Sequence, residues 1–421
     1  MLLKFSVENY GPFKEETVLD FHPSKLKDSD SCIIEKDDTS ALSVLGIFGM
    51  NASGKSYLLR ALANLASMMR FPLPAAMPIL AYAPFRLSSE TRNAPTKMNL
   101  EFICEGERFE YTVEFDGKSI LKESLDHFPN GQRAGVFKRD GNKITTPSGR
   151  FNEINSVSKL VSPNSTVVAV ASQFNTEILQ KIVRYLNTIF LVNPDLQASL
   201  QNVIKSVNED PEIRMMVLDA LSVADFGIDD IRGKISQVDL FELRNTMPSQ
   251  MLGMMLATGN ERVDQMTLHL IHHSSDPSLK KEDCCFDYTI ESSGTLRMIA
   301  IIGPVIQALR CGGVVLIDEF GAFLDHDICT WMISLFRSPV NHRGAQLVFN
   351  SHDQMLINTE DLFRRDQIYI SDKDPDSGES EIRPVSECSL RKDADVLKTY
   401  RAGKLGGRPY IVDSGKFNFH E

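Results

Sequence analysis

The sequence has few cysteines, fewer basic than acidic residues, and no long apolar run. Seven cysteines among 421 residues, an odd number, argue against a disulfide scaffold and indicate a reducing compartment, which we expect to be the cytoplasm. Lys and Arg total 45 against 56 Asp and Glu, which gives a net charge of −11. A protein of this charge is a poor candidate for coating nucleic acid, although a local basic patch would still allow binding.

The sequence pattern predicts neither a secretory signal nor a membrane-spanning helix. The opening residues MLLKFSVENYG lack the apolar centre of a secretory signal, so no leader is expected. The uncharged stretch 71–85 is too short to span a bilayer, and its four prolines would break a helix. We interpret that stretch as a loop and expect no membrane partner.

Length and pattern predict a mixed α/β fold. The 421 residues amount to two or three domain lengths, and 42% hydrophobic with 24% charged residues is an ordinary globular balance. Alternating segments predict antiparallel strands, continuous apolar runs predict buried strands, and helical spacing predicts a compact helical insertion. The expected strands are 2–7, 17–21, 41–48, 98–104, 108–115, 120–127, 136–144 (a hairpin), 166–171, 265–273, 313–317, 345–349, 367–371 and 381–385, and the expected helices are 56–69, 176–190, 194–207, 211–224, 296–309 and 394–400.

The strongest motif is GMNASGKS at 49–56, which fits G-x-x-x-x-G-K-[ST] between a predicted buried strand and a predicted helix. Its glycines let backbone N–H groups surround phosphate oxygens at a helix N-terminus. Lys55 would reach the β- and γ-phosphates, and Ser56 would ligate Mg²⁺. A chance match in a loop is the alternative. The predicted phosphate-binding residues are Gly49, Asn51, Ala52, Ser53, Gly54, Lys55 and Ser56.

A second motif is the apolar strand 314–317 that ends in Asp318 and Glu319, the pattern of a Walker B strand. Asp318 would hold Mg²⁺ through water, and Glu319 would act as the general base on the attacking water. A strand that simply ends in an acidic turn is the alternative, and the neighbouring phosphate loop makes it less attractive.

Three further features lie around these motifs. Ser292, Ser293 and Gly294 open a long apolar helix, which suggests the signature of an ABC-type ATPase or, more simply, an ordinary serine cap. His352 follows a buried strand, where it could contact the γ-phosphate or lie on the surface. Gln173 follows the predicted strand 166–171 and would link Mg²⁺ to the helical part, unless it is a plain loop residue.

In this order the motifs resemble ABC-type ATPases related to RecF and the SMC proteins. The opening FSVENYGPF resembles the first strand of that group, and the ending YRAGKLGGRP (400–409) resembles the tail of the subgroup called AAA family fifteen, which includes ATPases of anti-phage systems such as Septu and PARIS. The signature departs from that of transporter ATPases, since it reads Ser-Ser-Gly-Thr. The resemblance implies an ATPase head in two lobes, 1–172 and 261–421, with the helical insertion at 173–260 between them.

The resemblance also implies how the protein works. It predicts ATP and Mg²⁺ as cofactors and a head-to-tail homodimer, or a higher even-numbered oligomer, in which Ser292–Gly294 of one chain closes on the nucleotide of the other. Asp325 lies where such ATPases keep a loop that crosses the dimer interface. The expected function is an ATP-hydrolysing sensor or regulator of an anti-phage system, triggered by a phage protein and acting on an effector protein encoded nearby.

The main alternative is a DNA-maintenance ATPase of RecF/SMC type that binds duplex DNA, and a transporter ATPase is a remote third. A Toprim nuclease would need more α/β sequence than follows residue 372, so the acidic run 372–376 is interpreted as a charged turn. His269, His272 and His273, with Cys284 and Cys285, lack a zinc spacing and are interpreted as sheet residues.

Overall fold

The computed structural model describes residues 1–25, 32–36, 39–75, 77–146, 151–192, 196–239, 262–391 and 394–408. The chain divides into two units. Unit 1 comprises Met1–Leu191, Ala308–Gly321 and Asp325–Glu421, and unit 2 comprises Val192–Gln307 and Ala322–Leu324. The predicted end of the helical insertion, residue 260, lies outside the described residues.

The larger sheet of unit 1 is antiparallel, in the order β10-β9-β8-β7-β6-β1-β2 among the described residues. In β7, buried side chains alternate with partly exposed ones, as expected of a strand with one face on a core. The strands predicted here are confirmed. They are β1 Leu2–Glu8, β2 Thr17–Asp20, β6 Thr96–Cys104, β7 Glu107–Phe115, β8 Ile120–His127, β9 Ala134–Asp140 and β10 Lys143–Thr145.

The second sheet of unit 1 carries the motifs, in the order β11-β15-β16-β5-β17-β18. Strands β15, β16, β5 and β17 run parallel, so their carboxyl ends share one edge, and every residue of β5 is buried. The strands are β5 Val44–Gly49, β11 Ile189–Val192, β15 Val314–Ile317, β16 Gln346–Ser351, β17 Ile368–Lys373 and β18 Ser380–Pro384.

The apolar run 41–48, predicted as one strand, forms parts of two. β4 (Thr39–Leu42) pairs with β3 (Ile33–Lys36), and β5 begins at Val44 in the other sheet. Ser43 marks the change, because its N–H donates to Cys32 O while its carbonyl accepts from Leu347.

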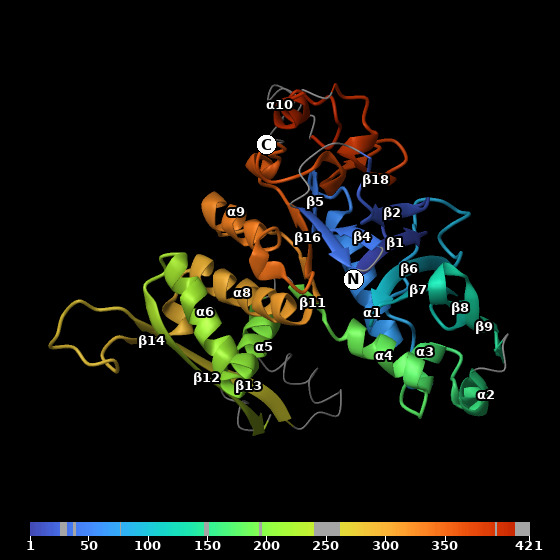
Figure 1. Cartoon of the computed structure of the whole chain (residues 1–421), viewed down its shortest axis with the longest axis horizontal. Coiled ribbons are helices and arrows are strands. Elements are labelled where there is room, and N and C mark those ends of the chain that lie inside the picture. The colour runs from blue at the N-terminus through green and yellow to red at the C-terminus, as the bar shows by residue number, and fades with distance from the viewer. Residues whose placement is uncertain are drawn as a thin grey trace, which may run out of the picture. The chain divides into compact units, whose positions relative to one another are not determined.

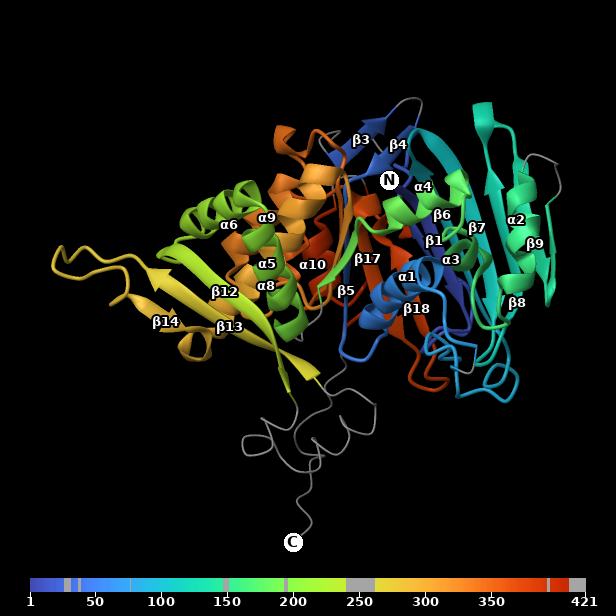
Figure 2. The same cartoon turned by 90° about the horizontal axis from the view of Figure 1, so that it is seen from below.

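Helix α1 (Lys55–Arg70) packs between the two sheets of unit 1 (Figure 2). Its buried residues recur every three or four positions, which is the pattern of an amphipathic helix. They include Leu58, Leu62, Leu65 and Met69. This packing fixes the start of α1, and therefore the phosphate loop that precedes it.

The prediction of a strand at 166–171 is wrong, because this run forms helix α3 (Val167–Ala171). The Thr166 hydroxyl accepts from the N–H of Ala169, and the buried Glu123 carboxylate accepts from the N–H of Val167. These contacts cap a single buried helical turn. The following predicted helix is also shorter, since α4 spans Glu177–Leu186 and the chain then enters β11. A further short helix, α2, spans Asn152–Val157.

Unit 2 combines helices with a hairpin. Helices α5 (Leu196–Glu209) and α6 (Pro211–Val223) confirm two predictions and lie beside β12 (Ile228–Asp239) (Figure 1). Strand β12 was not predicted, and it pairs with β13 (Arg262–His272), which also pairs with β14 (Cys285–Asp287). The predicted insertion is therefore not wholly helical.

Helix α8 (Ser293–Cys311) follows the hairpin. A side chain at Gly303 would place its Cβ 2.6 Å from Val203 on α5, so glycine permits the close packing of α5 and α8. Among the described residues, α8 is the one helix long and apolar enough to cross a membrane, but 72% of that stretch is buried inside the structure, as in a core helix. In the described part of the chain, two α-helices follow α8: α9 (His326–Leu335), which was not predicted, and α10 (Val396–Arg401).

Candidate functional site

The phosphate loop leaves β5 and enters α1, as the sequence predicts. Three of its residues have a positive φ, Gly49 at 152°, Ala52 at 61° and Gly54 at 96°. Successive backbone N–H groups in turns of this kind form concavities that bind anions. A side chain on Gly54 would meet Pro12 at 2.7 Å, so the loop has no room for one there. The Ser53 hydroxyl donates to Met50 O at 2.8 Å, which closes the loop on itself.

Lys55 is buried at the base of this loop, 5% exposed. Its ammonium donates to Gly49 O at 2.9 Å and to Met50 O at 2.6 Å. Burial lowers the pKa of Lys55 to about 8, although Asp318 and Glu319 oppose the shift. The amine therefore lies where a phosphate could replace loop carbonyls as its partner.

A hydroxyl–carboxylate pair lies beside the loop. The Ser56 hydroxyl donates to Asp318 Oδ1 at 2.6 Å, and Asp318 is 1% exposed. Arg60, one turn further along α1, places Nη2 3.6 Å from Asp318 Oδ2. Hard oxygen donors of this kind suit Mg²⁺, and the nearby guanidinium shows that the carboxylate attracts a cation.

Strand order explains how these motifs meet. Strand β16 lies between β15, which Asp318 follows, and β5, which ends at the start of the phosphate loop. Asn350, near the end of β16, donates to Asp318 Oδ1 at 2.6 Å and accepts from the N–H of Glu319 at 2.9 Å. One buried amide thus orients both acidic residues.

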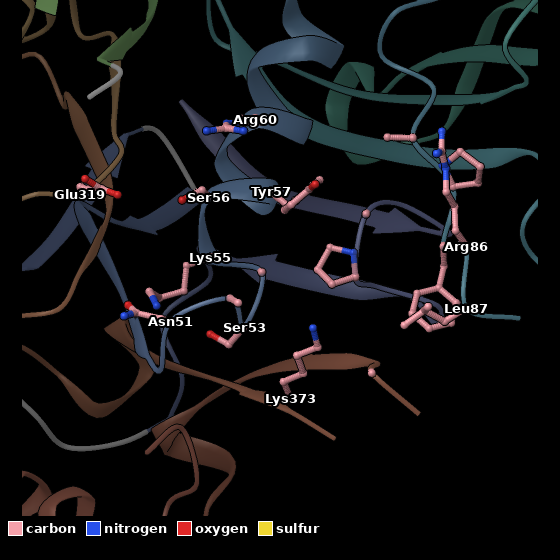
Figure 3. Close-up of a pocket in the computed structure, with 18 of the residues that line it drawn as sticks. Asn51, Ser53, Lys55, Ser56, Tyr57, Arg60, Arg86, Leu87, Glu319 and Lys373 are labelled. Carbon is pink, nitrogen blue, oxygen red and sulfur yellow. The ribbon is translucent and has the colours of Figure 1, made fainter. Parts of the chain in front are cut away.

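Glu319 occupies a left-handed backbone conformation, with φ at 55°. That region is sparsely populated for residues other than glycine, and such strain concentrates at functional sites. The hydrogen bond from its N–H to Asn350 helps to hold this conformation. The side chain lines the same pocket as Lys55 and Ser56 (Figure 3).

This pocket has a volume of about 810 Å³. Figure 3 shows Lys55, Ser56 and Glu319 at one end, and Arg86 and Leu87 at the other. The second end is formed by segment 82–87, part of the loop that follows α1. The pocket therefore joins a phosphate-sized end to a wider end that could hold a nucleoside.

His352 also lines the pocket, directly after β16. Burial, together with the positive charge of Lys55, lowers the pKa of His352, while Glu319 and Asp318 oppose the shift. The imidazole is consequently neutral at pH 7 and can donate or accept a hydrogen bond at the phosphate end.

The signature residues lie in unit 2. The Ser292 hydroxyl accepts from the N–H of Thr295 at 3.0 Å, which makes Ser292 a cap at the start of α8. Ser293 is exposed beside it. A Cβ on Gly294 would lie 2.8 Å from Phe323 O, so glycine lets segment 322–324 rest against the signature. Asp325 caps α9, where it accepts from the N–H of Asp327 at 2.9 Å.

Gln173 follows helix α3 and not a strand, and it is exposed. It is not among the residues that line the phosphate pocket. Its link to Mg²⁺ stays a prediction, and the premise that it ends a buried strand is wrong.

Sequence reasoning did not single out several pocket residues, because their spacing from the motifs follows no fixed rule. A basic residue one turn after the phosphate loop was an available signal for Arg60. Asn350 lies two residues before His352, and the sequence gives it no role of its own. The acidic run at 372–376, interpreted as a charged turn, places Lys373 at the pocket wall. The pocket residues concerned are Tyr57, Arg60, Tyr82, Arg86 and Lys373, and Asn350 contributes through its hydrogen bond to Asp318.

A known family matches most of the chain. The family model described as "AAA domain, putative AbiEii toxin, Type IV TA system" matches residues 44–358. The chain is similar to the SMC head domain from Thermotoga maritima, at 13% identity and a TM-score of 0.41, over 91% of this chain and 98% of that chain. It is also similar to the recombination mediator protein RecF of the RecFOR pathway, at 12% identity and a TM-score of 0.37, over 91% of this chain and 98% of that chain. A search of curated proteins finds no match.

Proposed function

Because the chain belongs to this family of AAA domains, which matches residues 44–358, we propose that it binds ATP with Mg²⁺ and hydrolyses it. The observation that carries the proposal is the meeting of three strand ends, which brings Ser56 and Glu319 to one pocket with Lys55 and places Asp318 against Ser56. The family match covers the phosphate loop, the signature, the Walker B strand and His352.

Each residue then has a role. The ammonium of Lys55 exchanges its loop carbonyls for the β- and γ-phosphate oxygens, and the loop N–H groups bind the remaining oxygens. Ser56 and Asp318 supply the oxygens that would hold Mg²⁺, which neutralises phosphate charge when bound. Arg86 and segment 82–87 line the end that accommodates the nucleoside.

Glu319 is the general base in this proposal. Its backbone is held by Asn350, and its carboxylate lies at the phosphate end of the pocket. From there it can accept a proton from a water that attacks the γ-phosphate. Neutral His352, on the same side, donates a hydrogen bond to the γ-phosphate and stabilises its charge.

The signature favours a second copy of the chain as the partner. Ser292, Ser293 and Gly294 start a long helix, whose N-terminus favours an anion. Two large apolar residues flank them, Phe323 at 73% exposed and Ile290 at 70%. Exposed apolar side chains next to an anion-binding turn suit an interface that closes over a nucleotide. We therefore include a head-to-tail homodimer in the proposal.

The test of the hydrolytic role is Glu319→Gln. The amide keeps the shape of the carboxylate but cannot accept the proton, so turnover should fall at least about a hundredfold while ATP binding persists. Nucleotide binding by fluorescence and phosphate release by a coupled assay separate the two effects. Glu360→Gln, an exposed change elsewhere, is the control. Wild-type turnover in Glu319→Gln would refute the assignment of the base.

For the biological role we propose an ATP-driven regulator in an anti-phage system, acting on a separate effector protein. The family description names a toxin of a Type IV TA system, which supports a defence context. The net charge of −11 favours a protein partner over bulk nucleic-acid binding.

The experiment is a pulldown with tagged Glu319→Gln chain, ATP present and the gene neighbourhood intact. A stoichiometric small protein without DNA would support the regulator. Bound duplex DNA and no protein would favour the DNA-maintenance alternative. Growth arrest caused by the wild-type chain alone, abolished by Lys55→Ala, would make this chain the toxin itself and contradict the regulatory role.

A further inference from the structure

The C-terminal turn is the sequence motif that the phosphate chemistry leaves unexplained. After α10, the chain turns back through three glycines with left-handed φ, Gly403 at 74°, Gly406 at 75° and Gly407 at 69°. We define this turn as residues 400–407. Repeated left-handed glycines permit a tight path that other residues resist.

The turn ends against the phosphate loop. A Cβ added to Gly407 would lie 2.7 Å from Ile370 Cγ2, 3.0 Å from Ser371 O and 3.3 Å from the Cα of Gly49. Gly407 is buried, and its carbonyl accepts a hydrogen bond from the hydroxyl of Tyr400 at 3.0 Å. Tyr400 is itself 2% exposed, so this bond holds the turn in place from within the core.

Ser371 connects the turn to both ends of the phosphate loop. Its hydroxyl donates to Ser53 O at 2.6 Å, near the end of the loop. A Cβ added to Gly49, the first loop residue, would lie 2.2 Å from the carbonyl oxygen of Ser371. The turn therefore packs on a strand residue that contacts the phosphate loop at both Gly49 and Ser53.

We propose that the C-terminal turn is a positioning element of the nucleotide site. It contacts no phosphate, but it presses Gly49 and Ser371 together and so keeps the loop N–H groups arranged for phosphate. The inference rests on the proposed ATP binding. Because coupling is reciprocal, bound ATP should stabilise the turn as much as the turn strengthens ATP binding.

A matched pair of glycine substitutions tests the contact. Gly407→Ala and Gly403→Ala both place a side chain at a left-handed φ, but a Cβ on Gly403 meets nothing within 4 Å. Gly407→Ala should weaken ATP binding roughly tenfold, because overpacking displaces Gly49 or Ser371. Gly403→Ala should also lower thermal stability, because alanine is strained at the same left-handed φ, but it should change the Kd for ATP less than about threefold. Equal Kd values for the two folded variants would overturn the proposal.

Tyr400→Phe provides a second test if Gly407→Ala does not fold. It removes the hydrogen bond to Gly407 and keeps the buried ring, so the Kd for ATP should rise about three- to tenfold. Hydrogen exchange gives a readout that a purely structural role would not move. ATP should slow exchange across residues 400–407 in the wild type and much less in Tyr400→Phe, and exchange unaffected by ATP in the wild type would contradict the coupling.

Lys55→Ala separates this inference from the proposed function. If wild-type chain binds ATP and Lys55→Ala does not, the function holds, and unchanged binding by Gly407→Ala and Tyr400→Phe overturns only the role of the turn. If the wild type binds no ATP, both proposals fail together.

Discussion

At the scale of single residues, Lys55 shows how the site is prepared for its ligand. The ammonium is buried and has two carbonyl partners that belong to the loop itself. Burial favours the neutral amine and lowers its pKa to about 8, whereas a bound phosphate would favour the cation. The protonation of this residue is therefore linked to nucleotide binding.

This linkage predicts a pH dependence of affinity. Above about pH 8 the free protein loses the Lys55 proton, and ATP must restore it, so binding takes up a proton and weakens as pH rises. The limit is about tenfold per pH unit for one proton. Titration of a fluorescent ATP analogue across this range measures the slope. Lys373→Met, at the wall of the same pocket, should keep the slope, and a flat profile in the wild type would contradict the prediction.

At the scale of elements, helix α3 shows what the sequence could not reveal. The run TVVAVA has the composition of a buried strand, and nothing local excludes one. Its helical form depends on Glu123 from β8, whose two carboxylate oxygens each accept from the N–H of Val167 at 2.9 Å. A partner 44 residues away decides the conformation, and single-sequence patterns do not record it.

Glu123 should consequently be important for stability. It is fully buried, lies 3.6 Å from Arg139 and accepts from the hydroxyl of Tyr111 at 3.0 Å. Glu123→Ala leaves Arg139 buried without its counter-charge and removes a cap of α3, so unfolding should become easier by about 3 kcal/mol. Denaturant unfolding measures the change. Glu114→Ala, in a half-exposed pair with Lys122, should cost less than about 1 kcal/mol, and equal losses would refute the account.

Some residues of the site could be predicted from the sequence, and others could not. Lys55, Ser56, Asp318 and Glu319 were predictable, because phosphate and Mg²⁺ chemistry demand these residue types at fixed positions after strands. Asn350 was not, since its role arises from the order of β15, β16 and β5 across the sheet. The stretch 71–85 was interpreted only as a loop, because the pocket-lining role of its last residues depends on where the chain folds back in space.

At the scale of the whole molecule, the phosphate loop belongs to unit 1 and the signature to unit 2. In a head-to-tail dimer each nucleotide would contact the loop of one chain and the signature of the other, and two-fold symmetry would repeat the arrangement. Chains defective in different halves of the site should then complement each other, because one of the two sites in a mixed dimer would be intact.

A mixture of Lys55→Ala and Gly294→Asp chains tests whether each nucleotide site is shared between two chains. Each variant alone should be nearly inactive, since one lacks the phosphate-binding amine and the other places a carboxylate at the signature, against Phe323 O. Random pairing gives half mixed dimers with one intact site each, so the mixture should recover about a quarter of wild-type turnover. Gly294→Asp mixed with itself after the same exchange protocol is the control.

Light scattering should show a doubled mass with Glu319→Gln and ATP. If both variants fold and pair but the mixture stays inactive, each site must be complete within one chain, which would contradict the head-to-tail dimer.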